Sequence, residues 1–428
     1  MFPNRSRTAL VLSLALLVAS LSLVPGAPED ESLKLDLGSA LALARENSPL
    51  IRAARERIQE AQGDLTTASI LLRNNPVASF AYGRRDSAGG APTQTDSGIA
   101  LFQEFEIAGQ RRARMGVATA EMEGARASAA DIERTIEAAV AWSFVEALAA
   151  AEKLALVEIN ARLAEELFDI SRVRVEKGAS APIELNASRI RLALARGQQA
   201  DALATLRRSR IVLLSLLGIG SGKPVDLVGS LPASEELPEP EALLTQAYAN
   251  RPDILAAEAE IRAAEAGVKL ARAEAWPSPV LGAEFSDDEG DRITSGTLSI
   301  ALPIFQRNQG VRMRAEAGLK RVREDLALIK LQVEREVREL LAEYERARAT
   351  LALYDDEVVK AMEENVVLLR TMFEAGKVGY TDVALLQRER IETGLALLQA
   401  RKDIATTTVN LRSSAGLPLV PAPQGGVR

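Results

Sequence analysis

The chain contains one internal duplication, which restricts the possible folds more than any other feature. Asn47-Ser48-Pro49-Leu50-Ile51 recurs as Asn250-Arg251-Pro252-Asp253-Ile254 about 200 residues later, and a repeat at a constant spacing indicates a duplicated structural unit. We therefore predict two structural repeats, residues 28–227 and 228–428, with the same order of elements. Within a few residues, the same spacing relates Pro76-Val77 to Pro279-Val280, Glu104-Phe105 to Pro303-Ile304, Gly178 to Gly376 and Leu217-Gly218 to Ala415-Gly416.

Each predicted repeat begins with a helix and continues with a pair of short strands. The helices start near Leu37 and Glu241 and run, with an interruption at the Asn-x-Pro sequence, to about Arg73 and Ala275. Alternating apolar and polar residues then predict half-buried strands. These strands are Val77–Arg85 and Ser97–Phe105 in the first repeat and Val280–Asp287 and Ile293–Leu302 in the second, with polar turns at residues 86–95 and 288–291.

The rest of each repeat is poor in proline and is predicted to form very long helices. From Val322 to Val358 apolar residues recur about every 3.5 positions, which is the spacing of a coiled-coil seam. The sequences Gly178-Ala179-Ser180-Ala181-Pro182 and Gly376-Lys377-Val378-Gly379 interrupt this periodicity, which resumes after each. They predict the tips of two helical hairpins, in a chain that is mainly α with a small β part.

The four strands predict a sheet with one apolar and one polar face, because Leu281, Ala283 and Phe285 alternate with small or polar residues. In an exported protein this pattern fits a barrel in an outer membrane; the alternative is an ordinary half-buried sheet. Four strands cannot close a membrane barrel, two chains would give about eight strands around a filled interior, and three would give about 12 around a lumen. A conduit therefore requires a trimer, whose helices would continue the wall as a coiled-coil helical barrel.

The composition excludes several classes of active site. The 428 residues include no cysteine and no histidine, which rules out Cys/His metal sites, histidine-dependent nucleophilic catalysis and disulfides. No pair of carboxylates indicates a hydrolase, and no Gly-x4-Gly-Lys-Ser/Thr loop is present for nucleotide hydrolysis. We therefore predict no catalytic residue, no metal site and no cofactor. The net charge of −7 argues against a nucleic-acid partner.

The first residues have the pattern of a secretory signal peptide. Arg5 and Arg7 precede the uncharged stretch Ala9–Val24, and small residues follow around Ala27. We predict that residues 1–27 direct export and are removed. The alternative is a retained membrane anchor, for which the apolar stretch is slightly too short. Because the chain has no cysteine, no lipid anchor on a processed N-terminal cysteine is expected.

The order of elements, together with particular short sequences, resembles the TolC-type outer-membrane efflux proteins, also called outer membrane factors. The resemblance rests on the stretches before Asn47-Ser48-Pro49 and Asn250-Arg251-Pro252, and on both hairpin tips. It extends over essentially the whole chain after the signal peptide. The strand-to-helix junctions FEIAGQRRAR (105–114) and LPIFQRNQG (302–310) are most similar to the branch that serves heavy-metal pumps, the cobalt–zinc–cadmium type.

The resemblance implies a homotrimer with a 12-stranded transmembrane β-barrel and a helical barrel that extends through the periplasm. Residues 28–45, 219–245 and 416–428 would form an equatorial region. The trimer would be a passive exit duct of a tripartite efflux system, docked to a periplasmic adaptor (a membrane fusion protein) and an inner-membrane pump of the RND type. The family's adaptor contacts carry over to the hairpin tips, at Gly178, Ala179, Ser180, Gly376, Lys377, Val378, Gly379, Tyr380 and Thr381.

The family also narrows its periplasmic end with acidic residues just past the second tip. Asp382 occupies this position and Glu184 occupies the equivalent position in the first repeat, whereas the next expected acidic position holds Leu385. The resemblance thus implies a partly acidic channel aperture at Asp382 and Glu184. The alternative interpretation is that both carboxylates stabilise helix N-termini, where the helix dipole favours negative charge.

Two other functions remain open from the sequence. A periplasmic coiled-coil scaffold or adaptor without a pore would share the long helices, although not two equal halves. An exit duct for type I protein secretion would share the whole architecture. Heavy-metal cations are one possible substrate, but the chain offers only oxygen and methionine ligands, so tight selection of a soft metal is not expected from its own residues.

Overall fold

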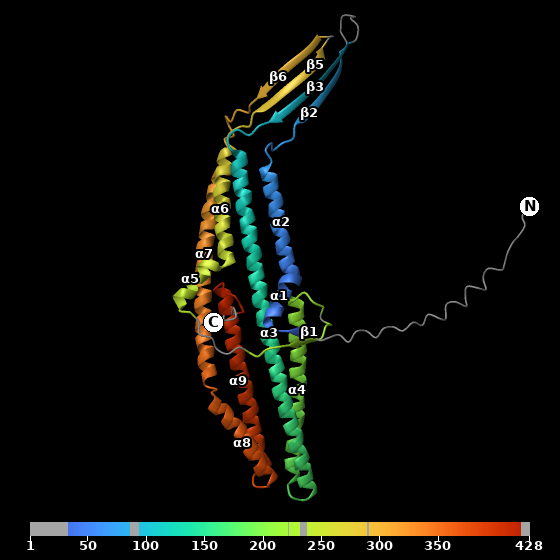
Figure 1. Ribbon diagram of the computed structural model, residues 1–428, viewed down its shortest axis with the longest axis vertical. Helices are drawn as coiled ribbons and strands as arrows, with labels where there is room; N and C mark the ends of the chain where they lie inside the picture. Colours follow the sequence, from blue (N-terminus) through green and yellow to red (C-terminus); the bar gives the residue numbers. More distant parts are fainter. Residues whose placement is uncertain (1–32, 86–93, 221, 232–237, 289–290, 421–428) are drawn as a thin grey trace, which may run out of the picture.

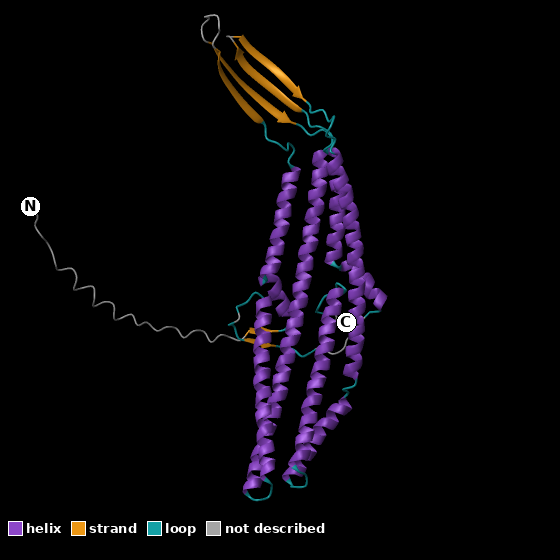
Figure 2. Cartoon of the chain, turned by 180° about the vertical axis from the view of Figure 1, so that it is seen from behind, coloured by secondary structure: helices purple, strands orange, loops and turns teal. Residues whose placement is uncertain are grey.

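The computed structural model describes residues 33–85, 94–220, 222–231, 238–288 and 291–420. They form one elongated body with a β-sheet at one end and the tips of two helical hairpins at the other (Figure 1). The predicted signal peptide and most of the turn predicted at 86–95 lie outside the described residues, as do residues 421–428. The prediction of a mainly α chain with a small β part is confirmed (Figure 2).

The elements follow the same order in the two halves of the chain. After the short strand β1 (Leu33–Leu35), the first half contains α1 (Leu37–Asn47), α2 (Pro49–Ser69), β2 (Val77–Arg85), β3 (Gln94–Glu104), α3 (Gln110–Glu176) and α4 (Pro182–Leu216). After β4 (Val225–Leu227), the second half contains α5 (Pro240–Asn250), α6 (Pro252–Ala273), β5 (Val280–Asp288), β6 (Asp291–Ser299), α7 (Gln309–Ala352), α8 (Asp356–Glu374) and α9 (Tyr380–Ser414).

Proline explains why the first helix of each half is divided. Pro49 and Pro252 stand at the first position of α2 and α6, where a missing backbone N–H costs nothing. The residues before them, Ser48 and Arg251, are extended, with ψ values of 122° each, because a residue that precedes proline avoids the helical region. The chain therefore changes direction at these two points and continues as a second helix.

The helices form a layer in which α3 is central. It contacts α2 and α4 on one side and α6 and α9 on the other, and α7 lies beyond α6 (Figure 1). The largest apolar core lies at mid-length, where α1 and the β1–β4 pair pack against α3 through buried residues such as Leu35, Val140 and Phe144. A second core joins α5, α6, α7 and α9 around Leu243, Ile254 and Ile404. The segments predicted to be equatorial, as far as they are described, thus lie at mid-length.

The sheet is a meander of four antiparallel strands in the order β2-β3-β5-β6. The strands of the first half pair with those of the second through β3 and β5, where Ile99 lies opposite Phe285. The outer strands β2 and β6 each have one edge without a partner in the described part of the chain. Such open edges are unfavourable unless another chain covers them.

Several predicted boundaries were wrong. Helix α2 ends at Ser69, before Arg73, and β6 ends at Ser299 instead of Leu302. Ser299 pairs with Val280, the first residue of β5 after a proline, so the next residues of the chain have no partner strand. Strand β3, in turn, begins at Gln94, three residues before the predicted start, because residues 94–96 pair with β2.

The predicted coiled-coil seam is also shorter than expected. Helix α7 ends at Ala352 and α8 begins at Asp356, so the seam does not continue through Val358, which is exposed. The Asp355 carboxylate accepts a hydrogen bond from the Val358 backbone N–H at 2.9 Å and starts the new helix. The apolar periodicity of the sequence continues past Asp355 and therefore did not indicate that this residue caps a new helix.

Candidate functional site

The register of the sheet separates apolar from polar side chains. Directly opposite residues on neighbouring strands lie on the same face, which places Phe80 with Ile99, Ile99 with Phe285 and Leu281 with Leu298. The apolar face therefore contains Ala78, Phe80, Tyr82, Ile99, Leu101, Leu281, Ala283, Phe285 and Leu298. All of the large residues among them are exposed in the single chain.

Most residues of the opposite face of the sheet are small or polar. They include Ser79, Ala81, Gly98, Ala100, Gly282, Glu284, Ser286, Ser295, Thr297 and Ser299. The larger apolar residues Val77, Phe102, Val280 and Ile293 also lie on this face. Exposing so many aromatic and aliphatic side chains to water is unfavourable. Each exposed side chain forgoes about 1.5–3 kcal/mol of free energy that its burial would contribute. A sheet with one apolar and one polar face can place lipid on one side and water on the other.

The first hairpin tip joins α3 to α4 through a left-handed glycine. Gly178 has a φ of 68°, and the Ala179 N–H donates to the Arg174 carbonyl at 2.8 Å, which closes the end of α3. Gly178 and Ala179 are exposed. Ser180 is half-buried, and its hydroxyl donates to the carboxylate of Glu184 in the first turn of α4.

The second tip repeats this arrangement between α8 and α9. Gly376 has a φ of 71°, and the Lys377 N–H donates to the Met372 carbonyl at 2.9 Å. Gly376, Lys377, Gly379 and Thr381 are exposed and Val378 is half-buried. Tyr380 differs from the other residues predicted to meet an adaptor, because its side chain is buried, with only 7% exposure.

The two hairpins contact each other at their tips through an aromatic cluster that the sequence did not reveal. Phe373 of α8 is fully buried, and its ring lies 6.4 Å from the ring of Tyr380. The Arg174 guanidinium of α3 lies 4.9 Å from the centre of the Phe373 ring, a favourable cation–π geometry. Apolar periodicity could place Phe373 on a seam, but it could not show that Arg174 of the other hairpin covers it.

The two predicted aperture carboxylates have different surroundings. Asp382 is exposed, and it accepts a hydrogen bond from the Gly379 N–H at 3.1 Å, which caps the N-terminus of α9. Glu184 is 14% exposed and lies 3.8 Å from the Arg174 guanidinium, measured from Nε to Oε1. Burial raises the pKa of the neighbouring Tyr380 hydroxyl. The helix-capping interpretation thus describes the local contact of Asp382, while Glu184 accepts a hydrogen bond from the Ser180 hydroxyl and lies beside Arg174.

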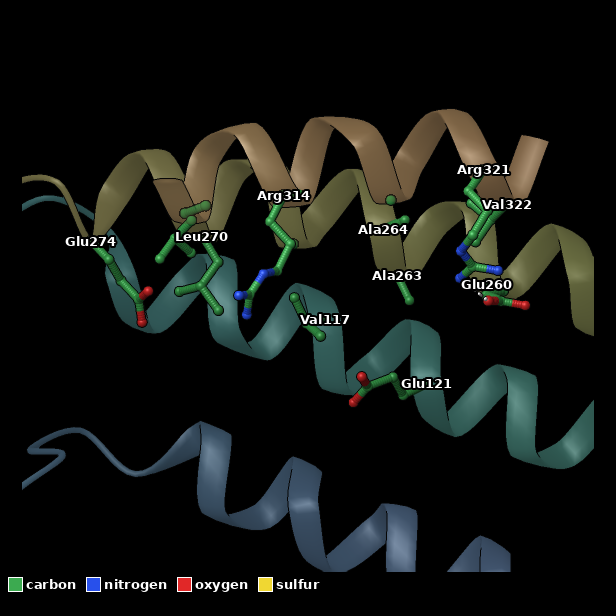
Figure 3. A pocket seen from close by; sticks show the side chains of 15 residues that line it. Val117, Glu121, Glu260, Ala263, Ala264, Leu270, Glu274, Arg314, Arg321 and Val322 are labelled. Carbon is green, nitrogen blue, oxygen red and sulfur yellow. Dashed lines mark hydrogen bonds and ion pairs between the residues drawn. The ribbon is translucent and has the colours of Figure 1, made fainter. Parts of the chain in front are cut away.

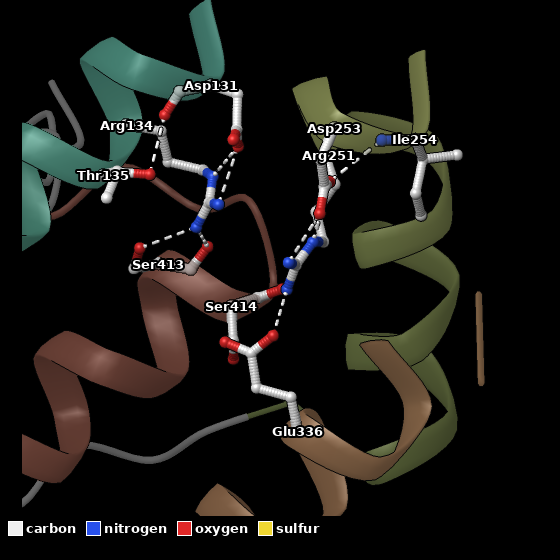
Figure 4. Close-up of polar contacts among 9 residues, drawn as sticks. All are labelled: Asp131, Arg134, Thr135, Arg251, Asp253, Ile254, Glu336, Ser413 and Ser414. Atoms are coloured by element: carbon white, nitrogen blue, oxygen red, sulfur yellow. Dashed lines mark hydrogen bonds and ion pairs between the residues drawn. The ribbon is translucent and has the colours of Figure 1, made fainter. Parts of the chain in front are cut away.

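At mid-length two arginines hold the C-terminus of α9 (Figure 4). Arg134 of α3 donates to the Ser413 carbonyl at 3.2 Å and pairs with Asp131 at 2.7 Å. Arg251 donates to the Ser414 carbonyl at 2.9 Å. Carbonyls at a helix C-terminus lack helical partners and carry partial negative charge, so guanidinium groups stabilise them.

A groove follows α6 between α3 and α7 (Figure 3). Helix α6 contributes small residues such as Ala263 and Gly267, and charged residues of the neighbouring helices include Glu121 and Arg314. Burial raises the pKa of the Glu121 carboxyl, and the negative charge of Asp64 raises it further. Among the described residues, no three Asp, Glu, His or Cys side chains form a group that could hold a metal ion.

None of the helices in the described part of the chain combines the length and the apolar character needed to cross a membrane.

Comparison with known proteins decides the family. A family model described as outer membrane efflux protein matches residues 40–219 and 243–417. The chain belongs to the outer membrane efflux protein family. The resemblance found in the sequence is confirmed, and this outer membrane efflux protein is a channel-forming protein, not an enzyme. The two matched stretches correspond to the two halves described above.

Two curated relatives are resistance proteins. The chain is 27% identical over 379 residues to the cobalt-zinc-cadmium resistance protein CzcC of Cupriavidus metallidurans, which covers 88% of this chain and 89% of CzcC. It is 26% identical over 325 residues to the nickel-cobalt-cadmium resistance protein NccC of Alcaligenes xylosoxydans xylosoxydans. This match covers 75% of this chain and 71% of NccC.

Among solved structures, that of CusC, described in terms of transmembrane channel formation, has a TM-score of 0.75 and 19% identity, covering 89% of this chain and 92% of CusC. This likeness shows the shared fold.

Proposed function

We propose that three copies of this outer membrane efflux protein form a continuous duct across the outer membrane and into the periplasm. The observation that carries the proposal is the four-stranded sheet, which has an apolar face, a polar face and two open edges. Lipid tolerates no unpaired backbone, so these edges must be covered. Three copies contribute about 12 strands, enough for a lumen, and the helical layers continue the wall.

A periplasmic scaffold without a pore fits the sheet less well. Such a protein would have to expose Phe80, Tyr82 and Phe285 to water, at 78%, 79% and 56% of their surfaces. A duct for type I protein secretion would have the same architecture, so the partner pump distinguishes it from a duct for small solutes. We propose heavy-metal cations as the substrate, since the relatives CzcC and NccC are named for resistance to cobalt and cadmium.

We further propose that the hairpin tips dock to a periplasmic adaptor that is bound to an RND-type inner-membrane pump. The exposed tip residues Gly178, Ala179, Gly376, Lys377 and Gly379 are available for this contact. The burial of Tyr380 suits a role in holding the hairpins together, so we assign it to the support of the docking surface. Export by a cleaved signal peptide, without a lipid anchor on cysteine, completes the proposal.

Asp382 is proposed as the carboxylate of the channel aperture. Three copies of this exposed side chain near a threefold axis would favour cations electrostatically. Asp382→Asn should therefore lower the cation selectivity of single channels in planar bilayers. Glu184→Gln serves as the comparison, because the Glu184 carboxylate is already paired with Arg174. Unchanged selectivity in Asp382→Asn would show that Asp382 only caps α9.

The duct itself is tested by extraction and conductance. We expect the full-length protein to fractionate with outer membranes, to require detergent for release and to form stable pores in planar bilayers. A water-soluble monomer without conductance would exclude the duct. If heavy-metal cations are the substrate, loss of the gene should increase the sensitivity of the cells to cobalt, zinc or cadmium. Increased sensitivity to dyes or antibiotics alone would contradict the proposed substrate and indicate organic compounds instead.

A further inference from the structure

The apolar face of the sheet extends to the end of the strands that adjoins the helices (Figure 1). Leu281 and Leu298 lie opposite each other there and are 50% and 61% exposed, whereas the same face carries Asp287 and Arg292 at its far end. The nine residues of β5 extend about 30 Å, or about 23 Å along the axis of a barrel with a strand tilt of about 40°. This height matches the apolar band of about 25 Å in outer-membrane barrels. The periplasmic boundary of the membrane therefore falls at the junction between strands and helices.

Two large apolar side chains are exposed at this junction. Trp276, between α6 and β5, is 66% exposed, and Ile107, between β3 and α3, is 65% exposed. The two segments are joined by the Phe105 N–H, which donates to the Pro279 carbonyl at 2.9 Å. The Gln110 side-chain amide also donates to the Trp276 carbonyl at 3.4 Å. Tryptophan is typical of membrane interfaces, because its ring is apolar while its N–H forms hydrogen bonds.

Local contacts hold the backbone at Trp276. Its N–H donates to the Ala273 carbonyl at 3.1 Å, which continues the last turn of α6. Pro277 and Pro279 follow, and proline restricts φ to about −65°. The segment therefore has few accessible conformations and presents the indole ring at a constant height beside the end of the sheet.

The charged side chains of the junction leave one arginine without an ion pair. The carboxylates of the two segments have partners, in the pairs Glu106 with Arg114, Glu274 with Arg73 and Glu104 with Asn74. Arg111 donates to the Ser69 carbonyl at 2.7 Å and so caps the end of α2. Arg112 is exposed and has no carboxylate partner among the residues that the structure describes. Its guanidinium is therefore available to an anion outside the chain, and a phosphate group matches it in charge and geometry.

We propose, on the basis of the duct proposed above, that Trp276, Ile107 and Arg112 anchor each copy in the inner leaflet of the outer membrane. The indole ring and Ile107 lie among the headgroups and first methylene groups of the phospholipids, and the Arg112 guanidinium binds a lipid phosphate. Aromatic residues flank the apolar band of outer-membrane barrels, and long cationic side chains extend to the headgroups. These three side chains fix the depth of the duct in the membrane, and thus how far the hairpin tips extend into the periplasm.

The fluorescence of the two tryptophans tests this position, because the chain contains only two. Trp142→Phe leaves Trp276 as the only fluorescent indole, and Trp276→Phe leaves Trp142. Trp142 is also partly exposed, at 45%. It lies about 48 Å along α3 from Gln110, at 1.5 Å per residue, and so serves as the reference outside the membrane.

Each full-length single-tryptophan variant is inserted into vesicles that contain a phospholipid brominated close to its headgroup. We expect bromine to quench Trp276 and to leave Trp142 unquenched, and a lipid brominated at its chain ends to quench Trp276 less. Equal quenching of the two tryptophans, or stronger quenching of Trp276 from the chain ends, would overturn the anchor if the inserted protein conducts ions. Failure to insert and conduct would instead contradict the proposed duct.

Arg112→Gln tests the phosphate contact. Arg126→Gln is the matched control, because Arg126 is also exposed on α3 but lies about 21 Å farther from the junction. The full-length proteins are stripped of lipid, incubated with phosphatidylglycerol and measured by native mass spectrometry. We expect wild type and Arg126→Gln to retain bound lipid and Arg112→Gln to retain less. Equal retention by the two variants would overturn the assignment of Arg112.

Discussion

The guanidinium of Arg251 makes several charged and polar contacts at mid-length (Figure 4). Its side chain is 6% exposed and pairs with Asp253 and Glu336, each at 2.8 Å, while it also caps α9. In the first repeat the same position holds Ser48, which is also buried. The repeats have therefore diverged at this residue, from a small hydroxyl to an ionic cluster that joins three helices.

Replacing Arg251 by methionine should destabilise the protein strongly. The change leaves the carboxylates of Asp253 and Glu336 and the end of α9 without their partner. Because these carboxylates are 26% and 44% exposed, water can replace part of the lost contact, and we expect a cost of about 1–3 kcal/mol. Arg262→Met is the control, because the Arg262 pair with Glu123 is exposed on both sides and should contribute about 0–1 kcal/mol. Denaturant unfolding in detergent measures the free energy of unfolding of both variants. Equal losses in the two variants would contradict a stabilising role of the Arg251 cluster.

The stability that Asp253 contributes should depend on pH. Burial alone would raise the pKa of the Asp253 carboxyl, but the hydrogen bond and charge of Arg251 lower it below its ordinary value of 3.8. A carboxyl with a lowered folded pKa stabilises the folded protein above its unfolded pKa, and this stabilisation is lost as the pH falls through the folded pKa. The stability difference between wild type and Asp253→Asn should thus be constant from about pH 7 to pH 5 and shrink below about pH 4. A difference independent of pH down to 3 would contradict the ion pair.

At the scale of elements, the long helices depend on a few contacts between hairpins. Helix α8 is separated from α7 by the cap at Asp355 and meets the first hairpin mainly through Phe373. The Phe373 cluster also includes Leu167 and Val383, both buried. Near the tips the two hairpins are therefore joined by this small apolar cluster and by the Arg191 guanidinium of α4, which donates to the Ala384 carbonyl of α9 at 2.7 Å.

Phe373→Ala should loosen the contact between the two hairpins. Removing a fully buried phenylalanine costs about 3–5 kcal/mol, and the loss should be local because the cluster lies at the end of the molecule. Met372→Ala is the control at the next residue, whose side chain is 41% exposed. Hydrogen exchange should increase across α8 and the start of α9 in Phe373→Ala only. Protection that is equal in the two variants would show that another contact holds the tips.

For the whole molecule, the sheet determines where the protein resides. One face contains a large apolar residue from each of the four strands, and most residues of the other face are small or polar, with Phe102 and Ile293 as exceptions. The polar face is compatible with a water-filled lumen. The assignment of the two faces can be tested with two adjacent residues of β6.

Leu298→Lys should prevent stable insertion into the outer membrane, whereas Thr297→Lys should be tolerated. Leu298 lies on the apolar face and is 61% exposed, and lysine facing lipid near the middle of a bilayer costs about 2–4 kcal/mol in each copy. Thr297 lies on the opposite face, so its lysine would remain in water and change the ion selectivity of the pore. The two variants are compared by their yield in the outer membrane and by single-channel recordings. If Thr297→Lys prevented insertion and Leu298→Lys were tolerated, the face that contains Thr297 would be the one in contact with lipid.

Much of this architecture was predictable from local patterns. The Asn-x-Pro sequences, the alternating strands and the glycine tips each act within a few residues, so the order of elements and the family could be inferred before any coordinates were known. Residues whose role depends on distant partners could not be found in this way. Arg174 covers Phe373 across two hairpins, and Arg251 reaches Ser414 from 163 residues away.

The sequence by itself determined the duplication, the mainly helical class, the two-faced strands and the membership in an efflux family, because backbone propensity and hydrophobic period are local properties. Only the tertiary structure decided that Tyr380 is buried and that Glu184 pairs with Arg174. It also decided that the segment between β6 and α7 repeats the backbone-to-glutamine hydrogen bond of the segment between β3 and α3. These facts depend on which segments meet in space, and the packing of the whole chain selects those segments.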